Sequence, residues 1–376
     1  MKVPYAYLAH QFADSERIFQ RVRELTETGD YTLGRPVQEF ESMLAVRLGI
    51  VHAIGVGSGT DGLKLALKAA GVGPGDEVVT AANTFIATIG AINDLGARPV
   101  LVDCDDSFCL DPDKLEDVLT SRTKAIVPVH LTGNMADMPR IMAIAGAHGL
   151  PVIEDACQAL MSSLDGRFAG CWGLAGVFSL HPLKFINIWG DGGVIVTNDG
   201  RIGSDLRLLR NHGLADRDTV VTLGYNSRLD SLQAVVAAHV FQTADEIVRQ
   251  RNQNAKFYDT ELSGLDGIRV PPRRSHVTHT FVTYQLFARD RQRLLEHCLA
   301  NGVDCKVHYP VPVYLQPALR CLGYEAGRFP VADRHARTVI TLPVHEYLTE
   351  EQLAYTVEVI RRFYAQGAHD ASCPLH

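Results

Sequence analysis

The sequence contains no long uninterrupted hydrophobic run, no excess of positive charge and no CxxC pair among its eight cysteines. The first absence argues against a membrane-spanning helix. The net charge of −7 argues against a nucleic-acid-binding surface. Because the cysteines show no zinc-site spacing, we expect reduced thiols and no metal site. The N-terminal stretch MKVPYAYLAHQFADSER lacks the apolar core of a signal peptide, so we expect a cytoplasmic protein.

Short apolar segments alternate with helical segments between residues 50 and 200. This alternation predicts an α/β fold with three layers, in which helices cover both faces of a mainly parallel sheet. Ligands of such sheets bind outside the carboxyl ends of the strands, so the residues that follow each strand are the candidates for a site. The predicted strands are residues 52–57, 76–82, 98–103, 124–130, 150–155, 176–180 and 193–198, and the helices between them are 61–71, 87–96 and 138–149.

The pattern changes after a long helical segment that begins near Leu229 and runs to residue 264. We expect a large domain over residues 1–246 and a smaller α+β domain over 247–376, and the first 15 or so residues could pack on the smaller one. Within the smaller domain, residues 267–288 are typical of strands and a hairpin, residues 290–302 and 350–366 are typical of helices, and the tail 368–376 is expected to be frayed.

The segment GSGTDGL, residues 57–63, follows a predicted strand and opens a helix. Glycines allow a tight turn, the helix start offers free N–H groups to an anion, and Thr60 adds a hydroxyl, so a phosphate site is indicated. A plain capped turn is the alternative. Gly57, Gly59 and Gly62 also match the dinucleotide fingerprint G-x-G-x-x-G, so a nicotinamide dehydrogenase is a second alternative. That fingerprint needs an acidic residue after the next strand, where the sequence has Ala-Ala-Asn-Thr-Phe.

Three further strand ends carry residues that could meet a ligand. Phe85 could stack on a flat ring, or it could be a core residue. Asp155 ends an apolar strand, and a buried carboxylate needs a partner such as a protonated pyridine nitrogen; it could instead cap the next helix. Gln158 lies one helical turn beyond Asp155, and Ser179 at the end of a later strand could join the phosphate site.

Lys184 lies in SLHPLKFINIWGDGGVIV, where apolar or small residues surround it. Lysines are usually on the surface, but these flanks are not typical of a solvated face. A desolvated amine becomes a nucleophile for carbonyl groups and forms Schiff bases. A phosphate cradle, a ring stacker, a carboxylate and an amine together are what a pyridoxal 5′-phosphate (PLP) site requires.

Eleven segments in the same order resemble the DegT/DnrJ/EryC1/StrS family of PLP-dependent sugar aminotransferases, which have the aspartate aminotransferase fold (fold type I). The resemblance covers nearly the whole chain. Its segments include GSGTDGLKLAL, GVGPGDEVVTAANTFIAT, AIVPVHLTGNMADM, VIEDACQA, SLHPLK, GDGGVIVTND, RNHG, residues 224–238 and HYPVPVYLQPA.

The resemblance implies a role for each candidate residue. Lys184 stands where the family has its Schiff-base lysine, Asp155 matches the partner of the pyridine nitrogen and Gln158 the residue near the phenolic oxygen of the cofactor. The phosphate cradle of the family matches Gly59, Thr60, Asp61 and Ser179, and its stacking aromatic matches Phe85. An asparagine that reaches the phosphate of the neighbouring subunit matches Asn226, and a loop near the sugar matches His308 and Tyr309. The implied unit is therefore a homodimer with active sites at the interface.

Two positions beside the lysine depart from the family pattern. Phe185 replaces a usual asparagine, and His181 replaces a common aromatic residue. These changes bear on the shape of the substrate more than on the use of the cofactor. Family members that are dehydratases carry histidine in place of the lysine, so Lys184 indicates transamination.

The resemblance implies a ping-pong transamination from L-glutamate, or L-glutamine, to a keto-sugar, most simply one linked to a nucleotide. Lys184 would shuttle the proton, and a 2-oxo acid, which is 2-oxoglutarate when L-glutamate is the donor, would leave after the first half. A keto-cyclitol or a long-chain keto acid sugar is an alternative acceptor. A non-catalytic regulator of the same fold that keeps the cofactor is an alternative of another class.

Overall fold

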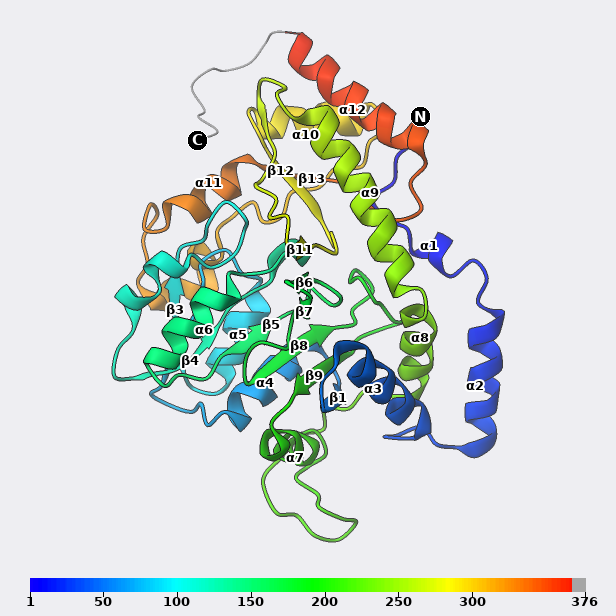
Figure 1. Ribbon diagram of the computed structural model, residues 1–376, viewed down its shortest axis with the longest axis vertical. Coiled ribbons are helices and arrows are strands. Elements are labelled where there is room, and N and C mark those ends of the chain that lie inside the picture. Colours follow the sequence, from blue (N-terminus) through cyan, green and yellow to red (C-terminus); the bar gives the residue numbers. More distant parts are fainter. Residues whose placement is uncertain (367–376) are drawn as a thin grey trace.

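The computed structural model describes residues 1–366, and residues 367–376, which include the tail expected to be frayed, lie outside the described part (Figure 1). The strands are β1 (His52–Val56), β2 (Glu77–Ala81), β3 (Arg98–Val102), β4 (Thr123–Val127), β5 (Ile153–Asp155), β6 (Ser163–Leu164), β7 (Arg167–Phe168), β8 (Ala175–Ser179), β9 (Gly193–Thr197), β10 (Ile268–Arg269), β11 (Val277–Thr278), β12 (Tyr284–Ala288) and β13 (Val339–Leu342).

The α-helices are α1 (Leu8–Gln11), α2 (Glu16–Thr28), α3 (Arg35–Leu48), α4 (Gly59–Ala69), α5 (Ile86–Asp94), α6 (Met138–Ala147), α7 (Gly200–Leu209), α8 (Ser231–Phe241), α9 (Ala244–Leu262), α10 (Arg291–Ala300), α11 (Pro330–Thr338) and α12 (Glu350–Ala365). Short 3₁₀ helices are η1 (Pro112–Lys114), η2 (Glu116–Val118), η3 (Leu131–Gly133), η4 (Val313–Leu315) and η5 (Pro317–Leu322).

The large sheet has the strand order β3–β2–β4 and β5–β8–β9–β1, and parallel bridges between Ile126 and Val152 and between Val129 and Asp155 join the two parts. β2 pairs in parallel with β3 and β4, and β5 pairs in parallel with β8. β9 runs antiparallel to both of its neighbours. All seven strands predicted from the sequence are present, and the expected mainly parallel sheet is confirmed. The carboxyl ends of β1, β2, β5 and β8 therefore meet at one edge.

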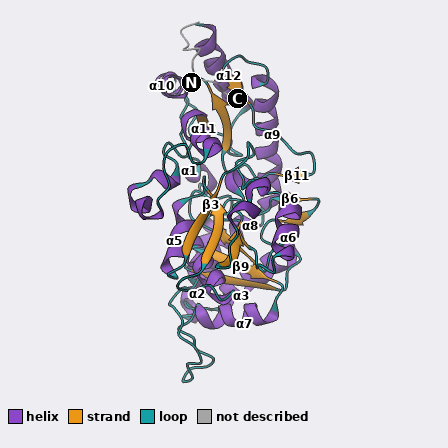
Figure 2. Ribbon diagram, turned by 90° about the vertical axis from the view of Figure 1, so that its left-hand side faces the viewer, coloured by secondary structure: helices purple, strands orange, loops and turns teal. Residues whose placement is uncertain are grey.

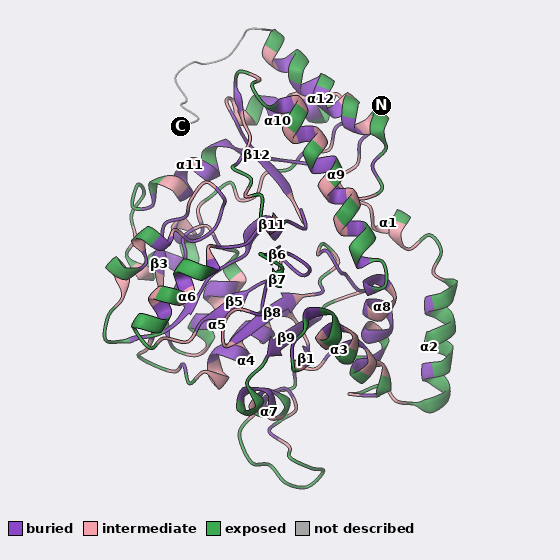
Figure 3. Ribbon diagram, in the orientation of Figure 1, coloured by how far each residue is buried: buried purple, intermediate pink, exposed green. Residues whose placement is uncertain are grey.

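Helices cover both faces of this sheet, which gives the three expected layers (Figure 2). Successive residues of a strand face opposite sides, so Val194 and Val196 of β9 belong to one core cluster while Ile195 belongs to the other. The first cluster takes side chains from α3, α6 and α8, and the second from α4, α5 and α7. The strands lie buried between these helices, whereas α2 exposes most of its length (Figure 3).

The C-terminal part has a core of its own, built on an antiparallel sheet with the order β10–β12–β13. Side chains of α9, α10 and α12 pack against it, and Val3 joins the same cluster. The strands expected within residues 267–288 are present, and β10 pairs antiparallel with β12. The strand between them, β11, does not join this pair, because it pairs with β6 instead. The proposed division of the chain near residue 246 falls in the first turn of α9.

The helical segment expected from Leu229 to residue 264 is present but interrupted, because the chain forms two helices, α8 and α9, with Gln242 and Thr243 between them. The Thr243 hydroxyl donates a hydrogen bond to the Val240 carbonyl at 3.0 Å, so it competes with the backbone ladder at this point. Asp245 and Glu246 then occupy the first turn of α9, where negative charge is favoured. The apolar periodicity continues through the break, which is why the sequence pattern did not indicate it.

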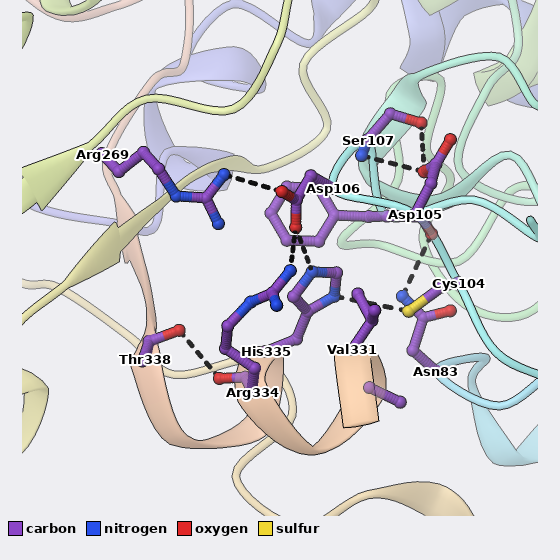
Figure 4. Close-up of polar contacts among 12 residues, drawn as sticks. Asn83, Cys104, Asp105, Asp106, Ser107, Arg269, Val331, Arg334, His335 and Thr338 are labelled. Atoms are coloured by element: carbon purple, nitrogen blue, oxygen red, sulfur yellow. Dashed lines mark hydrogen bonds and ion pairs between the residues drawn. The ribbon is translucent and has the colours of Figure 1, made fainter. Parts of the chain in front are cut away.

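Asp106, in the loop after β3, joins the large sheet region to the C-terminal part (Figure 4). Its carboxylate accepts hydrogen bonds from Arg269 at 2.8 Å and from Arg334 at 2.5 Å, and His335 approaches it at 3.5 Å. The hydrogen bond from His335, followed by those of the two guanidinium groups, holds the pKa of Asp106 well below its usual value. This carboxylate therefore stays charged at any working pH and ties β10 and α11 to the edge of the sheet.

Glu154, next to Asp155 in β5, is fully buried and has four hydrogen-bond donors. His130 donates through Nε2 at 2.9 Å, and the backbone N–H groups of Gly170, Trp172 and Gly173 donate at 2.6 to 2.8 Å. These contacts fasten the segment after β7 to the strand that carries Asp155. A buried carboxylate with this many donors leaves several unpaired groups if it is removed.

We expect Glu154→Ala to lower the free energy of unfolding by about 3 kcal/mol, since it removes one partner of a buried charged network. Urea unfolding followed by circular dichroism measures this change. The matched control is Glu116→Ala, whose carboxylate meets His148 at 3.3 Å on the exposed surface and should change stability by less than about 0.5 kcal/mol. Equal effects of the two variants would contradict the role given to Glu154.

None of the helices within residues 1–366 combines the length and the apolar character that crossing a bilayer requires.

Candidate active site

A cavity of about 350 Å³ opens at the carboxyl edge of the large sheet, between that sheet, the N-terminal residues and the C-terminal part. Eight of the predicted site residues line it: Gly59, Thr60, Phe85, Gln158, Ser179, Lys184, His308 and Tyr309. The structure therefore brings residues from six separate segments of the chain to one cavity. Asp61, Asp155 and Asn226 are not part of its lining.

The N-terminus of α4 forms one end of the cavity. Ser58 caps the helix, since its Oγ accepts a hydrogen bond from the Asp61 N–H at 3.1 Å. A Cβ placed on Gly59 would lie 2.8 Å from Cys157 Sγ and 2.9 Å from Ser179 Cβ, so only glycine lets the start of α4 pack this closely against Cys157 and Ser179. The N–H groups at the start of the helix and the hydroxyls of Ser58, Thr60 and Ser179 suit a phosphate group.

The carboxylate of Asp61 is not part of the cavity lining. It accepts a hydrogen bond from the Ser227 hydroxyl at 2.8 Å and pairs with Lys64 at 3.2 Å. Asp61 thus acts on the cradle through the backbone, where its N–H satisfies the cap, and it links the start of α4 to the segment that precedes α8.

Asp155 ends β5 behind the cavity lining and is only 5% exposed. Its Oδ2 accepts a hydrogen bond from the Thr88 hydroxyl at 2.7 Å, and its Oδ1 accepts one from the Cys157 N–H at 3.1 Å. Burial, followed by the charge of Asp155, raises the pKa of the Cys157 thiol well above its usual value, so this cysteine stays protonated. The carboxylate is held rigidly and has no basic side chain among its hydrogen-bond partners within residues 1–366.

Gln158 has a defined amide orientation. Its Oε1 accepts a hydrogen bond from the Thr132 N–H at 2.8 Å, so its Nε2 must point the other way, and Nε2 lies 3.4 Å from the Tyr309 hydroxyl. The ring of Tyr309 lies 6.0 Å from the ring of Phe85. Phe85 is 48% exposed at the start of α5, so it is not a core residue and presents its ring to the cavity.

Lys184 lies in an irregular loop between β8 and β9, held through its backbone. Its carbonyl accepts hydrogen bonds from the Tyr7 hydroxyl at 3.4 Å and from Asn187 Nδ2 at 3.2 Å. Its N–H donates to the His181 carbonyl at 2.8 Å. Within residues 1–366 its amine has no hydrogen-bond or ion-pair partner, so the nitrogen is available to a ligand in the cavity.

Phe185, one of the two departures from the family pattern, is buried beside the guanidinium of Arg251, whose Cζ lies 5.6 Å from its ring centroid. Arg251 also lines the cavity and pairs with Glu346 at 2.8 Å. The other departure, His181, is exposed and lines the cavity beside Lys184.

His308 faces the cavity from the C-terminal part, where its Nδ1 lies 2.9 Å from the Thr341 hydroxyl. Burial, followed by the positive charges of Lys184 and Lys306, lowers the pKa of His308 to about 4. The imidazole is therefore neutral at neutral pH. Burial raises the pKa of Tyr309, so its hydroxyl keeps its proton.

Asn226 lies away from the cavity, exposed on the surface of the chain, and its backbone forms an isolated bridge with Asn211. The resemblance implies that it acts in the neighbouring subunit, and that role stays a prediction.

Several residues of the site carry no signal that sequence reasoning used. Thr88 holds Asp155, and Tyr5, Tyr7 and Arg251 line the cavity. Ser58 differs from these residues, because a capped turn at residues 57–63 was an expected alternative and Ser58 provides that cap. The tyrosines and the arginine have no such pattern, because their place depends on how distant parts of the chain pack.

The sequence matches the model of the DegT/DnrJ/EryC1/StrS aminotransferase family over residues 13–361. Two similar curated proteins are each 40% identical to the chain. One is the pleiotropic regulatory protein of Geobacillus stearothermophilus, with 98% of this chain and 100% of the relative aligned. The other is the UDP-N-acetyl-3-dehydro-alpha-D-glucosamine 3-aminotransferase of Acidithiobacillus ferrooxidans, with 96% and 97% aligned.

The fold is also similar to solved structures. DesV of S. venezuelae, in complex with a ketimine intermediate, superposes with a TM-score of 0.94 at 35% sequence identity, covering 96% of this chain and 98% of the other. The likeness thus extends over the large sheet and the C-terminal part together.

Proposed function

Because the chain belongs to the DegT/DnrJ/EryC1/StrS aminotransferase family, we propose that it moves an amino group from L-glutamate to a nucleotide-linked keto-sugar with PLP as cofactor. The chain is a sugar transaminase. The observation that carries this proposal is the amine of Lys184, which lies without a protein partner in a cavity that also contains a phosphate-type cradle.

The residues present fit the cofactor. The N–H groups at the start of α4 and the hydroxyls of Thr60 and Ser179, which line the cavity, would hold the phosphate. Phe85 would lie against the ring, and Gln158 would face the phenolic oxygen. Asp155 offers the pyridine nitrogen a carboxylate that has no basic side-chain partner. When bound, PLP supplies an aldehyde that condenses with amines and a ring that accepts electrons.

The residues of the chain then have distinct tasks. Lys184 Nζ would take the proton from the Cα of the amino acid and deliver it to C4′ of the cofactor, which is general acid–base catalysis by an amine. Asp155 keeps a proton on the nitrogen that it faces, because a buried carboxylate is stabilised by a cationic partner. The neutral imidazole of His308 and the protonated phenol of Tyr309 orient the acceptor through hydrogen bonds without adding charge.

We also propose that the active unit is a homodimer. The segment between α7 and α8 exposes three apolar side chains, Val220, Val221 and Leu223, at 58, 56 and 83%, close in sequence to Asn226. Exposed apolar groups of this kind are typical of an interface. Light scattering should give twice the mass of one chain, and a monomer with full activity would contradict the shared site.

The test of cofactor and donor uses the purified chain loaded with PLP. Borohydride reduction followed by peptide mass spectrometry should place a pyridoxyl mass on the peptide that contains Lys184. Addition of L-glutamate, with L-glutamine in a second cuvette, should then change the visible absorbance in a single turnover. A loaded protein that does not react with either donor would be a non-catalytic regulator, and a protein that takes up only a nicotinamide cofactor would be a dehydrogenase.

The test of the acceptor is a panel of the sugars named in the relatives, run in the direction that each compound allows. It comprises UDP-N-acetyl-3-dehydro-alpha-D-glucosamine, UDP-2-acetamido-2-deoxy-3-oxo-D-glucuronate, dTDP-3-amino-3,4,6-trideoxy-alpha-D-glucose and dTDP-3-amino-3,6-dideoxy-alpha-D-galactopyranose. We expect turnover of at least one. A keto-inositol and a long-chain keto acid sugar are run beside them, and turnover of only these would overturn the nucleotide-sugar proposal.

A further inference from the structure

The N-terminal strap, residues 2–11, is bound to the C-terminal part at its start. Val3 forms a parallel bridge with Val303: its N–H donates to the Gly302 carbonyl at 2.9 Å and its carbonyl accepts from the Asp304 N–H at 3.0 Å. His345 Nε2 lies 3.0 Å from the carbonyl of Pro4. In Figure 1 the strap runs from the N-terminus, beside α9, to α1. Its first residues are thus fixed to the small core that α9, α10 and α12 cover.

The other end of the strap is bound to the loop that carries the reactive amine. The Tyr7 hydroxyl donates to the Lys184 carbonyl, and Gln11 Oε1 accepts a hydrogen bond from Asn187 Nδ2 at 2.9 Å. The residues between the two attachments, 5–8, all line the cavity. The strap therefore crosses one side of the cavity and is held on both sides of it.

Tyr5 continues a row of rings along this side. Its ring centroid lies 6.1 Å from that of His308, which lies 5.9 Å from Tyr309, which in turn lies 6.0 Å from Phe85. The row leads from the residue expected to face the cofactor ring to the strap. Aromatic faces with polar tips suit a ligand that is apolar on its faces and polar at its edge, as a sugar ring is.

The Tyr5 hydroxyl has no hydrogen-bond partner among the described residues, and the side chain is half-buried. Burial raises its pKa, so it keeps its proton and can donate a hydrogen bond. Tyr5 lines the cavity together with Tyr7, Arg251 and Tyr309, so a ligand in the cavity can reach its side chain. A polar group in such a position gains most from a ligand that satisfies it.

We propose that Tyr5 is a specificity-determining residue for the acceptor: its ring extends the aromatic wall along the sugar, and its hydroxyl donates a hydrogen bond to a sugar oxygen. The inference rests on the proposed function and deepens it. The row lines the side of the cavity that also contains Arg251, whose Nε donates to Glu346 at 2.8 Å and whose Nη2 has no hydrogen-bond partner among the described residues. The donor L-glutamate has no ring to pack against this aromatic row, so we expect the loss of Tyr5 to slow only the half-reaction with the sugar.

The experiment measures the two half-reactions separately for Tyr5→Phe and Tyr5→Ala. The probe is whichever sugar of the four-member panel the wild-type enzyme turns over with the highest kcat/KM. Tyr5→Phe should lower kcat/KM for this sugar about tenfold, which corresponds to one hydrogen bond, and Tyr5→Ala should lower it roughly 100-fold. The rate of the L-glutamate half-reaction should stay within about twofold of wild type in both.

Tyr355→Phe is the matched control. This tyrosine lies in the C-terminal part, and its hydroxyl donates to the Asn301 carbonyl at 2.9 Å. Asn301 is next to Gly302, where the strap is attached, but Tyr355 is outside the cavity lining. It should leave both half-reactions within about twofold. Equal losses in both half-reactions for Tyr5→Phe, or no loss with the sugar, would overturn the proposal. A wild-type enzyme that reacts with neither L-glutamate nor any panel sugar would instead refute the proposed function on which the inference depends.

Discussion

Lys184→Ala is expected to lower transamination by roughly 10⁴-fold while the protein stays folded and still takes up PLP without a covalent bond. The amine has no hydrogen-bond or ion-pair partner within residues 1–366 and the side chain is only half-buried in the cavity wall, so we expect the loss to be chemical rather than structural. A positioned general acid–base group alone accounts for 10²- to 10⁴-fold, and the same nitrogen is also the nucleophile. Stopped-flow absorbance after mixing with L-glutamate measures the rate, and equilibrium dialysis measures cofactor retention.

Two variants separate the chemistry of this amine from its charge. Lys184→Arg keeps a positive charge but cannot be deprotonated, so it should be as inactive as the alanine variant. Lys124→Ala removes an exposed lysine of β4, far along the chain from the cavity lining, and should keep full activity. Transamination by Lys184→Ala within tenfold of wild type would show that another group moves the proton, and the proposed mechanism would be wrong.

Much of the large sheet could be predicted because its strands are short, apolar and separated by helices of regular length. Each of the seven predicted strands overlaps an observed one, since buried parallel strands give continuous apolar runs that need no partner to be recognised. The two-residue strands β6, β7 and β11 carry no such run. β11 pairs with β6 across more than 100 residues, as between Val277 and Leu164, whereas β6 and β7 form a local antiparallel pair that is too short to leave a pattern.

The candidate site divides in the same way. Residues at strand ends or helix starts, such as Gly59, Ser179 and Asp155, could be predicted because secondary structure fixes where they lie. Lys184 is in an irregular loop, so its place in the cavity rested on the resemblance and on its apolar flanks. Tyr5 comes from a strap whose position is set by hydrogen bonds to residues some 300 positions away, which no local pattern encodes.

Asp155→Asn is expected to lower kcat by roughly 10³-fold. The amide has the same shape and can still accept the hydrogen bonds of Thr88 or Cys157, so the fold should be kept. What is lost is the negative charge that holds a proton on the facing nitrogen. Removing one member of a buried charged pair costs about 4 kcal/mol, and each 1.4 kcal/mol is about tenfold in rate.

Two quantities are compared for each variant, kcat and PLP affinity, and Asp155→Asn should lower both. The visible absorbance of bound PLP should also shift, because the protonation of its ring changes, and this shift separates the charge effect from lost binding. Thr88→Val removes only the hydroxyl at 2.7 Å and should lower kcat by about tenfold, since it withdraws one hydrogen bond from a charged group. Asp94→Asn, at the exposed end of α5, is the matched control and should change neither quantity. If Asp155→Asn behaves like Asp94→Asn, the carboxylate is only a structural cap for the segment that follows β5, which is the alternative that the sequence left open.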